Sequence, residues 1–140
     1  MVRKKFIIIA FMVITSLGTY AQKTFDHAYW ENTIDAIVQV ESNGKTNAVN
    51  GSCVGPMQIS RQLVKECNKI LRQKKSSKRY TMSDRKSLAK SKEMFYLFQK
   101  KYNTNGDITR AIRTWNGGLH YKTSRTNKYL RKVRNAMKVK

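Results

Sequence analysis

The spacing of apolar residues is the feature that most constrains the fold of this 140-residue chain. From residue 28 onward, apolar side chains recur mostly at intervals of three and four, which is the period of a helix that buries one face. The chain has a single proline and no repeat, proline-rich stretch or glycine/serine-rich linker that would divide it. We therefore expect one mainly α domain, since this length is typical of a single domain.

The same spacing predicts about five helices. Their expected ranges are residues 28–41, 60–71, 83–102, 107–118 and 123–138. Ser60 and Asp107 are expected to cap helices, because a serine or aspartate side chain accepts hydrogen bonds from free amides in the first turn. Residues 42–55 are too rich in Gly, Asn and Ser to be helical, so at most a short β-hairpin is expected near residues 46–59. Residues 72–80 predict a basic loop.

The first 21 residues have the pattern of a secretory signal peptide. Basic residues at positions 3–5 precede an apolar run over residues 6–17, and small residues precede the expected cleavage site after Ala21. The run is shorter than the roughly 20 residues that a membrane-spanning helix needs. We therefore expect an exported protein, periplasmic or secreted, with its mature domain at residues 22–140. An uncleaved N-terminal anchor is the alternative.

Cys53 and Cys67 are the two cysteines of the chain. Because exported proteins can keep disulfides, we expect a bridge between them. The alternative is that Cys67 is a small buried apolar residue of its helix. Two Cys and two His make a poor zinc set, so no metal site and no cofactor are expected.

Glu41 is the most informative residue, because it falls on the apolar face of the first expected helix. It follows Ile34 by seven residues and Ile37 by four. Burial disfavours the charged form of a carboxyl, and a carboxyl that stays protonated near neutral pH can act as a general acid. The periodicity taken alone favours the other interpretation, a glutamate at the end of a helix whose carboxylate reaches solvent.

Four short segments occur in a fixed order along the chain. They are Glu41-Ser42, Gly55-Pro56-Met57-Gln58-Ile59, Ala111 with Trp115-Asn116-Gly117-Gly118, and Tyr129-Leu130-Arg131-Lys132-Val133. In order and spacing they resemble the lytic transglycosylase (SLT) and goose-type lysozyme family over residues 30–134. Pro56 and Trp115 stand where that family more often has leucine and tyrosine, variations that are most similar to short Bacteroidota and phage-type members.

The resemblance implies a lysozyme-like fold with its cleft beside the hairpin, and a role for each matched residue. Glu41 matches the catalytic acid/base, and the Tyr129 hydroxyl matches a group that orients its carboxyl. The residues that match the substrate-binding positions are Ser42, Met57, Gln58, Trp115, Asn116, Gly117 and Tyr129. Plain core packing is the alternative for the side chains of Met57, Trp115 and Tyr129.

The reaction that the resemblance implies is cleavage between N-acetylmuramic acid and N-acetylglucosamine in peptidoglycan. Glycosidases with two carboxylates place them roughly 5–9.5 Å apart, but no partner for Glu41 stands out. Glu93 is the best remaining candidate, although a salt bridge with neighbouring lysines is its expected role. Asp26, Asp84 and Asp107 are expected to cap helices, and Glu31, Asp35 and Glu66 to lie on polar helix faces.

A single acid suits a lytic transglycosylase, in which the C6 hydroxyl of the sugar closes a 1,6-anhydro ring. A hydrolytic goose-type lysozyme that uses the same Glu41 is the runner-up, because the two outcomes differ in the placement of water.

The charge of the chain favours an anionic partner. It carries 29 Lys and Arg against 8 Asp and Glu, a formal charge of +21, and twelve of the basic residues lie in residues 61–92. The expected partners are peptidoglycan strands and the anionic surface of the cell envelope, for a monomeric protein. No nucleic-acid partner is expected, because no binding signature occurs and the signal peptide argues against DNA. A noncatalytic cationic module that binds the cell wall or a membrane is the alternative from another class.

Overall fold

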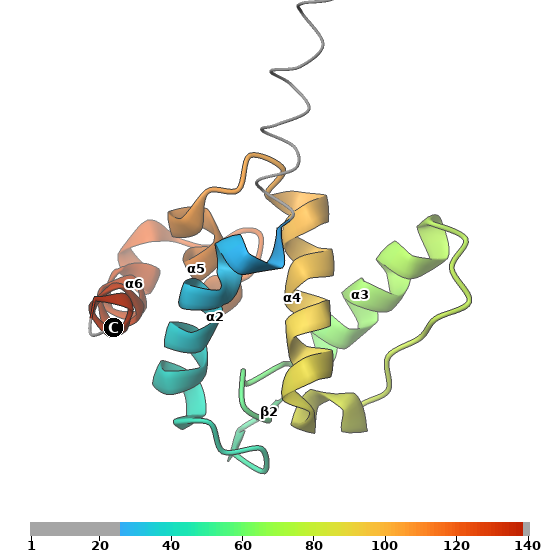
Figure 1. Ribbon diagram of the computed structural model, residues 1–140, viewed down its shortest axis with the longest axis horizontal. Coiled ribbons are helices and arrows are strands. Elements are labelled where there is room, and N and C mark those ends of the chain that lie inside the picture. Colours follow the sequence, from blue (N-terminus) through green and yellow to red (C-terminus); the bar gives the residue numbers. More distant parts are fainter. Residues whose placement is uncertain (1–25, 139–140) are drawn as a thin grey trace, which may run out of the picture.

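Five α-helices and a two-stranded antiparallel hairpin form the described part of the chain, residues 26–138 of a computed structural model (Figure 1). In chain order the elements are α2 (His27–Ser42), β1 (Val49–Asn50), β2 (Cys53–Val54), α3 (Arg61–Gln73), the 3₁₀ helix η1 (Ser83–Lys86), α4 (Leu88–Tyr102), α5 (Ile108–Gly117) and α6 (Thr123–Met137). The expected mainly α, lysozyme-like class with a short hairpin is confirmed. The predicted signal peptide and its cleavage site after Ala21 lie outside the described residues.

Helix α4 stands between two groups of elements (Figure 1). Helices α2, α5 and α6 pack against one another on one side, and α3 packs against α4 on the other. Helix α3 and the loop after it project away from α2, so the two lie at opposite sides of the molecule in this view. The fold therefore separates the end of α2 from most of the basic segment that α3 begins.

The core forms where the apolar faces of α2, α4 and α5 meet. Trp30, Ile34 and Ile37 of α2 are buried. Trp30 packs edge-to-face on Phe95 of α4 with ring centroids 5.5 Å apart, and Ile112 of α5 is fully buried beside them. Burying one large apolar side chain contributes about 1.5–3 kcal/mol. This face of α2 therefore fixes the direction in which the last turn of the helix presents its side chains.

Side-chain caps set the helix starts, as the sequence predicted at Ser60 and Asp107. The Ser60 hydroxyl accepts a hydrogen bond from the amide of Leu63 at 3.1 Å. The Asp107 carboxylate accepts one from the amide of Arg110 at 3.0 Å. Asp26 caps α2 in the same way. These contacts satisfy amides that have no partner inside the first turn of a helix.

The predicted helix over residues 83–102 is wrong at its start. The first residues form η1, and Ser87 then has an extended backbone, with φ −87° and ψ 122°, from which its hydroxyl caps α4. Asp84, an expected cap, instead accepts a hydrogen bond from the amide of Thr81 at 2.7 Å and closes the turn before η1. The chain breaks here because the Ser87 side chain competes with the backbone for a free amide.

A buried arginine holds the hairpin against η1. The Arg85 guanidinium donates hydrogen bonds to the carbonyl oxygens of Ser52 at 3.0 Å and of Ile59 at 3.3 Å. Gly55 has a φ of +89° and packs so closely that a Cβ at this position would lie 1.8 Å from the Arg85 carbonyl oxygen. Because only glycine allows the backbone to come this close to Arg85, residues 55–59 pack tightly against η1.

The predicted disulfide between Cys53 and Cys67 is wrong, because both thiols are free. Cys67 is buried in α3, where its thiol donates to the carbonyl oxygen of Met94 at 3.6 Å, while Cys53 lies half-buried in β2. Burial raises the pKa of the Cys67 thiol to about 12, and the charge of Glu66 adds to the effect. The alternative prediction, a small buried apolar residue, describes Cys67.

Candidate active site

Glu41 and Tyr129 meet at the contact between α2 and α6. Glu41 lies in the last turn of α2, and the Tyr129 hydroxyl donates a hydrogen bond to its Oε1 at 2.6 Å across 88 residues of sequence. Helices α2 and α6 pack side by side, so this contact is built into the fold (Figure 1). The predicted pairing of these two residues is present in the structure.

Burial sets the proton affinity of Glu41. Desolvation raises the pKa of the Glu41 carboxyl above its ordinary value of 4.5, and the hydrogen bond from Tyr129 opposes this rise in part. The pKa of Tyr129 is raised by its own burial and then by the charge of Glu41, so its hydroxyl keeps the proton that it donates. The Glu41 carboxyl therefore keeps its proton to a higher pH than an exposed glutamate does, and its Oε1 is held in place by a neutral hydrogen-bond donor.

The positive charge of the chain does not cancel this effect. Ion pairs join Lys78 and Lys90 to Glu93, and Lys92 to Glu31. None of them reaches Glu41. A nearby cation would favour the carboxylate and lower its pKa, and the structure gives that arrangement to other glutamates.

Ser42 ties the end of α2 to the segment at residues 55–59. Its hydroxyl donates to the carbonyl oxygen of Pro56 at 2.8 Å and to that of Val38 at 3.4 Å, and it accepts from the amide of Gly44 at 3.1 Å. Its polar atom is thus engaged inside the protein. Ser42 positions the turn next to Glu41, and a contact of Ser42 with substrate stays a prediction.

Met57 is fully buried, so the core-packing alternative describes its side chain, and a substrate contact at this position stays a prediction. Its backbone carbonyl oxygen accepts a hydrogen bond from the indole Nε1 of Trp115 at 3.1 Å. The Trp115 ring also packs on Phe95, with centroids 5.2 Å apart. Met57 and Trp115 therefore join the segment at residues 55–59 to α5 and α4.

The side-chain amide of Gln58 has hydrogen-bond partners for its nitrogen and none for its oxygen. Its Nε2 donates to the carbonyl oxygens of Gly55 at 2.9 Å and Ala48 at 3.2 Å, while its Oε1 is buried and has no hydrogen-bond partner. Its backbone φ of +50° is unusual for a residue other than glycine. A buried acceptor without a donor costs about 1–3 kcal/mol.

A groove of about 510 Å³ runs between α3, α4 and the end of α5. Four of the predicted residues line it, namely Gln58, Trp115, Asn116 and Gly117. Glu41, Ser42, Met57 and Tyr129 do not line it. The segment at residues 55–59 joins the two groups, because it contacts α2 through Ser42 and α5 through Trp115.

Gly117 is glycine for a packing reason. A Cβ at this position would lie 2.7 Å from the Cβ of Tyr121 and 2.9 Å from the Cγ2 of Thr126. The backbone at Gly117 therefore approaches α6 and the loop before it closely. Asn116, the residue before, is exposed in the groove wall and free to offer its amide to a ligand.

Sequence reasoning missed several groove residues. The lining also includes Leu63, Glu66, Phe98, Leu119 and His120. The signal for Glu66 was its position three residues after Leu63, which places the two on one face of α3. Its carboxylate accepts a hydrogen bond from the Tyr102 hydroxyl of α4. The residue expected on a polar helix face thus lies in the groove.

Glu93 has the role that the sequence predicted for it. Its carboxylate pairs with Lys78 at 2.5 Å and with Lys90 at 3.3 Å. The hydrogen bond from Lys78 is the main reason that the pKa of Glu93 is lowered. Such a carboxyl stays ionised and is a poor proton donor.

Two structural features are absent from residues 26–138. No group of three or more His, Cys, Asp or Glu side chains is arranged to hold a metal ion. No helix within this range is long and apolar enough to cross a bilayer.

Comparison with known proteins identifies the family of the chain. The family described as Transglycosylase SLT domain matches residues 19–138. No curated protein and no solved structure matches the chain. The family match covers the whole described region, including both helices that carry the Glu41–Tyr129 pair. The chain therefore belongs to the SLT domain family of peptidoglycan-cleaving lytic transglycosylases.

Proposed function

We propose that this protein cleaves the bond between N-acetylmuramic acid and N-acetylglucosamine with Glu41 as general acid and base. The observation that carries the proposal is the 2.6 Å hydrogen bond from Tyr129 to a partly buried Glu41 whose pKa is raised. A general acid works best when its pKa lies close to the working pH, and burial moves a glutamate in that direction.

Each proton in the reaction passes through one carboxyl oxygen. Tyr129 occupies Oε1 of Glu41, so Oε2 donates the proton to the glycosidic oxygen as the bond from that oxygen to C1 breaks. The acetamido group of the substrate stabilises the positive charge that develops at C1. The Glu41 carboxylate then accepts the proton of the C6 hydroxyl, whose oxygen bonds to C1. The 1,6-anhydro ring closes without water, and Glu41 regains its starting proton.

The groove between α3 and α5 supplies the sugar contacts. The exposed amide of Asn116 contacts a hydroxyl or acetamido group of the glycan, and Gln58 lines the same groove. A groove of this size is typical of ligand sites. The segment at residues 55–59 keeps these contacts in register with Glu41, because it is bonded to both α2 and α5.

We also propose that the protein acts outside the cytoplasm, in the periplasm or after secretion. The support is the sequence pattern of residues 1–21, and peptidoglycan is found in that compartment. N-terminal sequencing of exported protein tests this. A start at Gln22 is expected, and a start at Met1 or Val2 would mean an anchored form.

Product analysis tests the chemistry. Purified peptidoglycan is digested with the wild type, with Glu41→Gln, and with Glu93→Gln as a matched control that removes an exposed, ion-paired carboxyl. Mass spectrometry should find 1,6-anhydro-muramyl ends from the wild type and the control, and none from Glu41→Gln. Reducing ends would instead assign a hydrolytic lysozyme. Equal cleavage by Glu41→Gln would remove Glu41 from the mechanism.

A further inference from the structure

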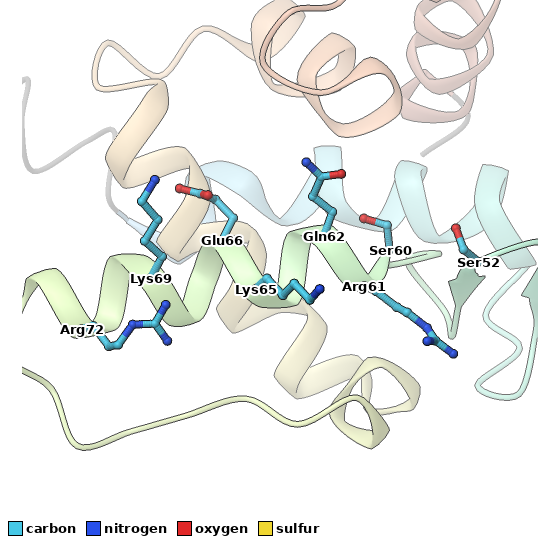
Figure 2. Close-up of a pocket in the computed structure, with 8 residues that line it drawn as sticks. All are labelled: Ser52, Ser60, Arg61, Gln62, Lys65, Glu66, Lys69 and Arg72. Carbon is cyan, nitrogen blue, oxygen red and sulfur yellow. The ribbon is translucent and has the colours of Figure 1, made fainter.

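A second groove lies along α3 and carries a row of cations. It has a volume of about 660 Å³ and is lined by Ser52, Ser60, Arg61, Gln62, Lys65, Glu66, Lys69 and Arg72. Figure 2 shows its cationic side chains distributed along the whole length of the helix, with Ser52 at the hairpin end. Nothing in the reaction proposed above uses this groove.

The cations of the α3 groove are spaced regularly. Arg61, Lys65 and Lys69 follow one another at intervals of four residues, and Arg72 follows three residues later. With a rise of about 1.5 Å per residue, the first three cations lie about 6 Å apart, Arg72 lies about 4.5 Å farther along, and the row extends about 16 Å along the axis. An extended peptide advances about 3.3–3.6 Å per residue, so about two of its residues match each interval. The row is therefore about as long as a peptide of four or five residues.

These cations are available to a partner. All four are exposed, and within residues 26–138 none of the four forms an ion pair. Glu66 is the one carboxylate in the lining, and it accepts a hydrogen bond from Tyr102. The groove therefore has a net positive charge that no ion pair with another part of the described chain neutralises.

The α3 groove is continuous with the groove that holds Gln58 and Asn116. Ser60, Gln62 and Glu66 line both. A glycan strand bound in the groove that holds Gln58 and Asn116 would thus place its side branches at the edge of the α3 groove. The branches of peptidoglycan are short peptides on muramic acid, and they carry free carboxylates.

We propose that the α3 groove binds the peptide branches of peptidoglycan through their carboxylates, an inference that rests on the proposed function. Arg61 and Lys65 meet the branch nearest the shared wall, and Lys69 and Arg72 meet carboxylates farther along it. The contact orients the strand and increases its retention, while the bond-breaking step stays with Glu41. Free polyanions such as polyphosphate share the negative charge but lack the branched geometry that links the two grooves.

The test compares a groove variant with a matched surface variant. The double variant Lys65→Gln/Lys69→Gln removes two charges from the row. The control Lys101→Gln/Lys128→Gln removes two exposed charges from α4 and α6 that line neither groove. Steady-state cleavage is measured on whole peptidoglycan, on glycan strands stripped of peptides, and on peptidoglycan whose carboxyls have been amidated.

We expect the groove variant to raise the KM for whole peptidoglycan about fivefold to tenfold, as the loss of two surface ion pairs implies, with kcat unchanged. On stripped and on amidated substrates it should equal the wild type, and the control should equal the wild type throughout. An unchanged KM, or an equal loss on stripped strands, would overturn the proposal.

A binding measurement separates this inference from the proposed reaction. A soluble, uncrosslinked peptide branch is titrated into the wild type and the groove variant by calorimetry, with polyphosphate of equal charge as a second titrant. Binding of the peptide that is lost in the variant supports the groove whether or not the protein cleaves glycan. Equal losses for both titrants would indicate a general anion surface and contradict a peptide site.

Discussion

The Glu41–Tyr129 pair and the α3 groove place their ionisable groups in opposite environments, one partly buried and the other exposed. In the pair, one carboxyl is partly buried, contacts a neutral hydroxyl donor and has a raised pKa. In the groove, four exposed cations follow one helix within reach of solvent. A chain with a formal charge of +21 thus keeps its cations out of ion pairs with the acid and places them where a substrate would arrive. Burial sets the proton affinity of Glu41, whereas the exposed cations of the α3 groove favour the first contact with an anionic substrate.

The two regions depend on one shared support, and removing it should give the largest effect on stability. Gly55→Ala places a Cβ 1.8 Å from the carbonyl oxygen of Arg85 at a φ of +89°. We expect a loss of about 2–4 kcal/mol in the free energy of unfolding, from backbone strain and forced repacking. Urea denaturation measures it.

Gly51→Ala is the matched control, because its φ is +58° and a Cβ there meets nothing within 4 Å. It should lose only the cost of a left-handed backbone, about 1–2 kcal/mol. Equal losses for the two variants would mean that the packing of residues 55–59 on η1 is not tight.

Removing the Tyr129 hydroxyl should lower the catalytic activity of Glu41 and leave binding in the α3 groove unchanged. In Tyr129→Phe the donor to Glu41 is gone, and because that hydrogen bond lowers the pKa of Glu41, the pKa should rise. We expect cleavage to fall about tenfold as the carboxyl loses its orientation, and the alkaline limb of the pH–rate profile to move to higher pH. Binding to intact cell wall at low salt should stay the same.

Two glutamates of opposite character give a smaller, pH-dependent comparison of stability. The folded pKa of Glu41 is raised, so the folded state binds the proton more tightly and stability falls as pH rises from 4.5 through the folded pKa. Glu41→Gln removes this penalty, and its thermal midpoint should exceed that of the wild type at pH 7, with the gain shrinking toward pH 4.

Glu93 should respond with the opposite sign. Its folded pKa is lowered by Lys78, so its contribution to stability is present above pH 4.5 and is lost as pH falls through the folded value. Glu93→Gln should lower the thermal midpoint slightly at pH 7, since solvent screens this ion pair. Thermal unfolding at pH 4 and pH 7 measures both variants, and shifts of equal sign at pH 7 would contradict the contrast.

Local signals in the sequence predicted much of the fold. The helices follow from apolar spacing, and the caps at Ser60 and Asp107 follow from residues whose side chains bond the nearest free amides. The break at Ser87 was missed, because residues 83–87 contain no apolar residue that would fix the start of the helix, and the start is set by the Ser87 hydroxyl alone. Helix starts that depend on a single side chain are visible only once the competing hydrogen bonds are known.

The site was predicted less completely, because it depends on contacts between distant segments. Glu41 was singled out by its place on the apolar face of its helix, while its pairing with Tyr129 was expected from the resemblance to a family, and the structure brings the two together. The sequence also suggested substrate contacts for Met57, whose side chain is in the core, and a bridge for Cys67, whose thiol faces the carbonyl of Met94. Glu66 was placed on a polar face, since periodicity does not reveal that α4 and α5 turn this face into a groove wall.

Measuring the proton affinity of Glu41 tests its proposed role as the acid most directly. The side-chain carboxyl carbon of Glu41 is followed by NMR across a pH titration in the wild type and in Tyr129→Phe. We expect a pKa above 4.5 in the wild type and a higher one in the variant, because burial raises the pKa of Glu41 and the Tyr129 hydrogen bond opposes the rise. A wild-type pKa at or below 4.5, or a fall in Tyr129→Phe, would contradict the claim that burial makes Glu41 the acid.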